Sequence, residues 1–150
     1  MSGKILNALL FGALLTFIID MIVFIGLKST YLAYFDVKEF FNPFFYDNQN
    51  IFIFFGVSTV FGALIFFFGF NKYVATIYIA LFLGSFIVFI KPIGLGLGEM
   101  IFMQKQVPIT DIKGKVEPYD IIYDGRRYLY LRKNEGSMTL VIDKTTQISR

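Results

Sequence analysis

Three long apolar runs, at residues 5–27, 51–70 and 73–90, constrain this chain more than any other feature. An α-helix rises about 1.5 Å per residue, so crossing the roughly 30 Å hydrocarbon core of a bilayer takes about 20 residues. The first two runs reach that length and the third nearly reaches it. We therefore predict three transmembrane helices, in keeping with a composition of 56% hydrophobic residues.

The first run and the link between the other two each carry a further prediction. The first run is longer than the apolar core of a signal peptide, and "GLKSTYLAYF" after it offers no convincing cleavage motif, so we expect an uncleaved anchor. Only Asn71 and Lys72 separate the second run from the third. So short a link predicts an antiparallel helical hairpin.

The stretch "KPIGLGLGEMIFMQK" at 91–105 leaves alternatives open. Pro92 interrupts the preceding helix, the glycines that follow weaken a further one, and the twelve residues 92–103 are too few to cross a bilayer. We favour a kinked or interfacial continuation, because irregular backbone in lipid must be shielded by protein. A re-entrant segment or a fourth short crossing is the alternative.

Residues 104–150 form a polar tail with nine Lys or Arg and six Asp or Glu. Asp124 and Gly125 are typical of a two-residue hairpin turn, residues 128–131 alternate aromatic and aliphatic side chains, and "KNEGS" predicts the next turn. We expect an antiparallel β-meander that "TTQISR" extends. At about 45 residues it is near the lower limit for an independent core. We therefore expect the tail to be stabilised by packing against the membrane helices, a second copy or a larger partner.

The predicted fold class is an α-helical integral membrane protein with three transmembrane helices, a candidate fourth short or re-entrant segment, and a small C-terminal antiparallel β tail domain. The domains are 1–103 and 104–150. We predict a multi-pass protein of the cell inner (plasma) membrane with a cytoplasmic tail, because positively charged loops favour the cytoplasmic side. Three crossings place more lysines beside the tail, namely Lys28, Lys38, Lys91, Lys105, Lys113 and Lys115, than on the other side, which has Lys4 and Lys72.

Each apolar run carries small residues at a spacing of four, which places them on one helical face. Such faces let helix backbones approach closely in lipid, so we favour mutual packing, within the chain or between copies, over a lined pore. The predicted packing residues are Ala8, Gly12, Gly62, Ala80 and Gly84.

Asp20 is a carboxylate inside the first run, where a charge is costly and usually faces protein or water. Counting inward from the ends of the three runs on the tail side places Asp20 on the order of 10 Å inside the boundary. The same count brings hydroxyl residues of the other runs to that level. The predicted intramembrane polar cluster is Asp20, Thr16, Ser58, Thr59 and Ser85.

The absence of Cys and His from the sequence removes disulfides, the usual zinc sites and His-based acid–base catalysis. We expect no cofactor, metal or catalytic residue. Acids alternate with bases along the tail, which argues against a nucleic-acid surface. The candidate contacts for a partner or for lipid head groups are Arg126, Arg127, Arg132 and Lys133.

We therefore predict a non-enzymatic membrane protein that acts as a subunit or scaffold of a membrane complex, with the β domain docking a partner. Its expected partners are membrane lipid and other subunits of the complex or further copies of itself. The alternative is an oligomeric ion channel or proton-coupled transporter that uses Asp20, with Glu99 as a second acid if 92–103 re-enters the membrane.

Overall fold

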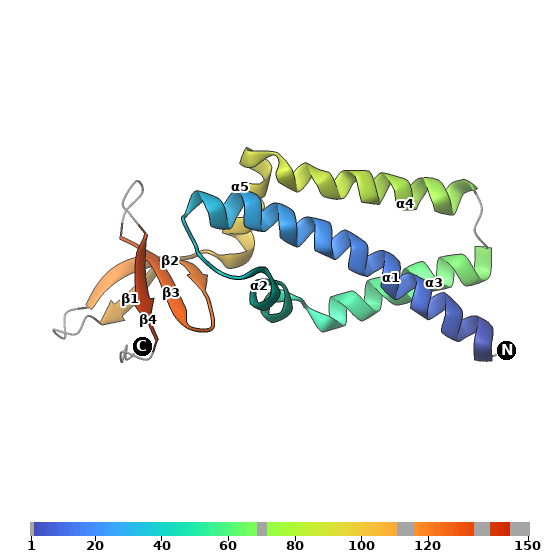
Figure 1. Ribbon diagram of the computed structural model, residues 1–150, viewed down its shortest axis with the longest axis horizontal. Helices are drawn as coiled ribbons and strands as arrows, with labels where there is room; N and C mark the ends of the chain where they lie inside the picture. The colour runs from blue at the N-terminus through green and yellow to red at the C-terminus, as the bar shows by residue number, and fades with distance from the viewer. Residues whose placement is uncertain (1, 69–71, 111–115, 134–138, 145–150) are drawn as a thin grey trace.

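The computed structural model is an elongated molecule with a helical bundle at one end and a small sheet at the other (Figure 1). It describes residues 2–68, 72–110, 116–133 and 139–144. The N-terminus lies at the far end of the bundle, and the strands follow the last helix (Figure 1). This arrangement agrees with the predicted order of a helical part followed by a β tail.

The helices follow the predicted apolar runs closely, and two shorter helices, at Phe41–Asn48 and Lys91–Phe102, lie outside those runs. Gly3–Leu32 and Lys72–Phe89 are each long and apolar enough to cross a membrane, and the pair Phe41–Asn48 and Ile51–Ile65, bent by 79°, makes a third if it counts as one span. In chain order the helical elements are α1 (Ser2–Leu27), the π-helix η1 (Lys28–Leu32), α2 (Phe41–Asn48), α3 (Ile51–Phe68), α4 (Lys72–Ser85), the 3₁₀-helix η2 (Phe86–Phe89) and α5 (Lys91–Phe102).

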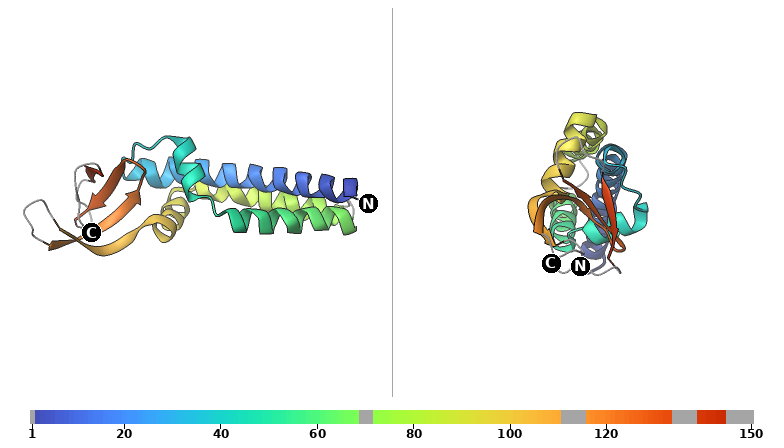
Figure 2. Two further views of the ribbon diagram at one scale, coloured as in Figure 1. Left: turned by 90° about the horizontal axis from the view of Figure 1, so that it is seen from below. Right: turned by 90° about the vertical axis from the view of Figure 1, so that its left-hand side faces the viewer.

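The helices α1 and α3 form the closest pair in the bundle. A Cβ atom added to Gly12 would overlap the backbone oxygen of Ser58, and one added to Gly62 would lie 2.8 Å from the backbone oxygen of Ala8. Backbones can approach this closely only where the side chain is a hydrogen atom, as in other small-residue contacts between membrane helices. The helix α4 runs alongside this pair and then turns into α5 (Figure 2).

Residues 92–103 fold as the regular helix α5 up to Phe102, in spite of their three glycines. Pro92 occupies the first turn, where its missing N–H costs nothing. Gly94 and Gly98, one turn apart, lie against Thr30 and Tyr31 of η1 so closely that a Cβ atom on either would overlap the side chain it faces. Tertiary packing therefore overrides the low helix propensity of glycine here, and α5 lies between the bundle and the sheet (Figure 1).

The tail is a four-stranded antiparallel sheet in the order β1-β2-β3-β4, which is the predicted meander. β2 ends at Asp124 and β3 begins at Tyr128, so the hairpin loop contains residues 125–127 instead of the two predicted. Most of "KNEGS", and "TTQISR", lie outside the described residues. The strands are β1 (Gln104–Thr110), β2 (Val116–Asp124), β3 (Tyr128–Arg132) and β4 (Leu140–Asp143).

The sheet and the helices share one hydrophobic core. The phenol of Tyr31 donates a hydrogen bond of 2.8 Å to the backbone oxygen of Ile122, 91 residues further along the chain. Tyr31 and Ile122 are both fully buried. The tail therefore packs against the helices of its own chain, which is one of the three packing partners expected from its small size. The buried members of this core are Leu27, Tyr31, Leu32, Phe35, Val37, Phe44, Val88, Phe102, Ile122, Tyr123 and Tyr130.

Candidate functional site: the groove beside Asp20

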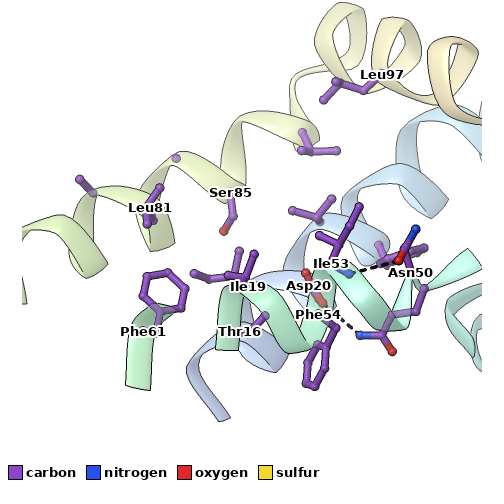
Figure 3. Close-up of a pocket in the computed structure, with 17 residues that line it drawn as sticks. Thr16, Ile19, Asp20, Asn50, Ile53, Phe54, Phe61, Leu81, Ser85 and Leu97 are labelled. Carbon is purple, nitrogen blue, oxygen red and sulfur yellow. Dashed lines mark hydrogen bonds between the residues drawn. The ribbon is translucent and has the colours of Figure 1, made fainter. Parts of the chain in front are cut away.

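A groove of about 620 Å³ separates α4 from the α1–α3 pair, and Asp20 lies on its wall (Figure 3). Twelve of its 17 lining residues are apolar or glycine. The remaining five are Thr16, Asp20, Gln49, Asn50 and Ser85. Among these lining residues, Asp20 is the one with an ionisable side chain. The groove therefore combines a mostly apolar wall with a single carboxylate.

The contact between Gly12 and Ser58 sets which residues of α3 face Asp20. Asp20 lies eight residues after Gly12 on α1, and Asn50 lies eight residues before Ser58 in the sequence. The side-chain amide of Gln49, just before Asn50, donates a hydrogen bond of 3.0 Å to Asp20 Oδ2 (Figure 3). Asp20 therefore lies level with the start of α3, not with the middle of that helix.

Asn50 begins α3 as its N-cap. Its side-chain oxygen accepts hydrogen bonds of 3.1 Å from the backbone N–H groups of Phe52 and Ile53. Those N–H groups have no carbonyl partner within the helix, so an Asn oxygen at this position stabilises the helix start. The bend between α2 and α3, with its two polar side chains, thus places Gln49 and Asn50 at the groove.

The predicted polar cluster divides into two groups. Thr16, Asp20 and Ser85 line the groove together, and Ser85 points into it from α4 (Figure 3). Ser58 is buried at the level of Gly12, about two helical turns from Asp20. Thr59 is exposed, and its hydroxyl donates to the backbone oxygen of Phe55. Neither Ser58 nor Thr59 lines the groove.

The predicted packing residues divide in the same way. Ala8, Gly12 and Gly62 lie in the contact between α1 and α3. Ala80 and Gly84 instead line the groove, and a Cβ atom on Gly84 would meet no atom within 4 Å. The small face of α4 is therefore turned toward open space within this chain.

The four basic residues proposed as partner or lipid contacts each pair with an acid of the same chain. Arg126 donates two hydrogen bonds, of 2.6 and 2.5 Å, to the carboxylate of Asp47 on α2, and they hold the pKa of Asp47 below its usual value. Glu117, 2.5 Å from the Lys133 ammonium, raises the pKa of Lys133. The other two pairs are Arg127 with Asp143 and Arg132 with Asp120.

Among the polar residues that line the groove, Gln49 and Asn50 are the two that were not predicted from the sequence. The stretch "YDNQN" before the second apolar run is typical of a helix N-terminus, which identifies the cap, but nothing in it identifies the contact with Asp20. Within the described residues, no group of three or more His, Cys, Asp or Glu could hold a metal ion. Comparison with known protein families, with curated proteins and with solved structures finds no match to this chain.

Proposed function

We propose that this chain is a non-enzymatic integral membrane subunit or scaffold that holds its C-terminal sheet at a fixed position beside the membrane for a partner protein. The observation that carries this proposal is the shared core of the helices and the sheet, closed by the hydrogen bond between Tyr31 and Ile122. A sheet tethered only by a flexible linker would not transmit the position of the helices to a partner.

Further contacts support a rigid connection. Asn48 donates to the phenol oxygen of Tyr123 at 3.1 Å, and Thr139 donates to the backbone oxygen of Phe35 at 2.9 Å. Together with the pair of Arg126 and Asp47, these contacts join α2, the segment after η1 and the sheet. Several polar contacts in addition to a buried core favour one orientation of the sheet.

The surface that we assign to the partner is the outer side of β4. In the described part of the sheet β4 is an edge strand, and Leu140 and Val141 on it are about half exposed. An edge strand offers backbone N–H and C=O groups to which another strand can add. The basic residues of the sheet, which were the other candidate contacts, are each paired with an acid of the same chain. Because these pairs already use their charges, we favour the β4 edge over the basic residues as the docking surface.

Affinity purification of the full chain from its native membranes tests this proposal. We expect one partner protein to copurify with the wild type and with the control Val116→Lys, which changes an exposed residue at the start of β2. Leu140→Lys and Val141→Lys should lose that partner while the helical content measured by circular dichroism stays unchanged. Equal recovery with all variants, or no partner with any, would contradict docking on β4.

We propose that the sheet lies on the cytoplasmic side of the membrane. The lysines beside the tail support this orientation through the positive-inside rule. A reporter fused after Arg150 that is active only in the cytoplasm should be active, and one that is active only outside should be silent. The opposite pair of results would place the sheet outside.

Proton-coupled transport is the second candidate, and the position of Asp20 on an open groove favours it. Reconstituted protein should then pass protons, and Asp20→Asn should abolish the flux while Asp36→Asn, at an exposed carboxylate outside the groove, should preserve it. Under the scaffold proposal neither variant has a flux to lose.

A further inference from the structure

The groove beside Asp20 has a polar part and an apolar part. Asp20, Gln49 and Asn50 lie together where α2 bends into α3. From there the groove follows α3 and α4 toward the N-terminal end of α1, where its walls are Val57, Phe61, Ala80 and Leu81 among others (Figure 3). A molecule that fills both parts must have a polar end and an apolar chain.

The polar part lies near one face of the membrane if the apolar helices span it. The 18 residues of α3 rise about 27 Å, close to the roughly 30 Å thickness of the hydrocarbon core. Asp20 is level with the first residues of α3, so it lies at the end of this span that is nearer to the sheet. A lipid head group would reach this level, with its chain extending along α3 and α4.

The chemistry of the polar part selects a head group that donates hydrogen bonds. Gln49 bonds to Asp20 Oδ2, and within the described residues no other side chain bonds to this carboxylate. Asp20 Oδ1 can accept a further bond, and a carboxylate in an apolar groove attracts a cation. Asn50, whose side-chain oxygen caps α3, carries two amide N–H groups that can donate to a head-group oxygen.

The size of the groove suits a small molecule. About 620 Å³ lies within the range of roughly 300–1,000 Å³ of ligand pockets, which are mostly apolar with a few placed polar groups. We propose that this groove binds a membrane lipid with a primary ammonium head group, which donates to Asp20 while one acyl chain lies along α3 and α4. This site is separate from the β4 edge and does not depend on the proposed docking there.

Native mass spectrometry of the purified full chain tests the head group. The probes are phosphatidylethanolamine, phosphatidylcholine and phosphatidylglycerol with identical acyl chains; the first has a primary ammonium, the second a quaternary one without N–H donors, and the third no cation. We expect phosphatidylethanolamine to bind roughly tenfold more tightly than either other lipid. Asp20→Asn should remove this preference, and the control Asp36→Asn should keep it. Equal binding of all three lipids to the wild type would overturn the proposal.

A second pair of variants tests the apolar part without touching Asp20. Gly84→Phe fills the groove, whereas Gly56→Phe places the same side chain on α3 outside it, and a Cβ atom at either position meets nothing within 4 Å. Binding of phosphatidylethanolamine should fall at least tenfold in Gly84→Phe and stay unchanged in Gly56→Phe. Unchanged binding in both variants would place the lipid elsewhere and overturn the proposal.

The remaining occupant to exclude is a second copy of this chain. The sequence has no Cys, so Leu81→Cys introduces a single thiol on the wall of the groove. With a lipid in the groove, oxidation should leave this variant monomeric in gels run without reductant. Efficient formation of a disulfide-linked dimer would show that a protein helix occupies the groove and would overturn the proposal.

Discussion

Gln49 and Asp20 are joined by a hydrogen bond of 3.0 Å between the side-chain amide of one and the carboxylate of the other, across 29 residues of sequence. This contact links α1 to the bend that begins α3, and it places the carboxylate on the wall of the groove. Both proposals about Asp20, lipid binding and proton transfer, depend on this position.

Gln49→Leu should destabilise the bundle. The substitution leaves a partly buried carboxylate without its donor, which costs about 1–3 kcal/mol. Thermal unfolding in detergent, followed by circular dichroism, measures the loss. Gln104→Leu, at an exposed glutamine of β1, is the matched control and should have little effect. Equal melting temperatures for the wild type and Gln49→Leu would contradict a structural role for this hydrogen bond.

Gly12→Ala and Gly56→Ala should have opposite effects on stability. The new Cβ atom of Gly12→Ala overlaps the backbone oxygen of Ser58, so α1 and α3 must move apart at a cost of about 1–3 kcal/mol. Gly56 has no atom near its Cβ position, so alanine there should instead stabilise the helix by up to about 1 kcal/mol. Unfolding of both variants under the same conditions checks the sign. A neutral Gly12→Ala would refute the close contact.

Ser58→Ala should stabilise the protein. Ser58 is 3% exposed, and its hydroxyl has no hydrogen-bond partner within the described residues. Removing a buried hydroxyl that makes no hydrogen bond should raise the free energy of unfolding by about 1 kcal/mol. The control is Thr59→Val, which removes a hydroxyl that does bond, to the backbone of Phe55. A loss of stability in Ser58→Ala would mean that this hydroxyl has a partner in the membrane.

Tyr31→Phe should loosen the connection between the helices and the sheet. It removes the hydrogen bond to the backbone oxygen of Ile122, which is worth about 0.5–1.5 kcal/mol. Hydrogen exchange should become faster in β2 and stay unchanged in α3. Tyr34→Phe, at a half-exposed ring, should leave exchange in both elements as it is. Unaltered exchange in β2 with Tyr31→Phe would show that packing alone holds the sheet.

Alkaline pH should lower the free energy of unfolding, because the phenol of Tyr123 is buried in the folded protein. Burial raises the pKa of the Tyr123 phenol to about 12, from an ordinary value of 10. Between these values the folded state keeps a proton that the unfolded state loses, so stability is complete below pH 10 and falls as the pH rises toward 12. Tyr123→Phe should reduce this fall in denaturant titrations at successive pH values. An identical pH profile for the variant would assign the fall to other groups.

Much of the fold was predictable because it depends on local chemistry. Apolar length predicted the helices, and alternation with turn residues predicted the strands of the tail. Local propensity was a poor guide at 92–103, where Gly94 and Gly98 suggested a weak helix. Their contacts with Thr30 and Tyr31 stabilise α5. Helix propensity describes single residues, so it does not include such contacts between distant segments.

The sequence by itself determined which segments are apolar, which residues are small enough for close helix contacts, and that one carboxylate lies inside the first apolar run. Only the tertiary structure decided what lies beside that carboxylate. The sequence count assumed that the first two helices meet the membrane boundary together, but α1 continues through η1 beyond the start of α3. The contact of Gly12 with Ser58 then sets the register, which places Gln49 and Asn50 opposite Asp20, because the close approach of two backbones determines which turns of neighbouring helices meet.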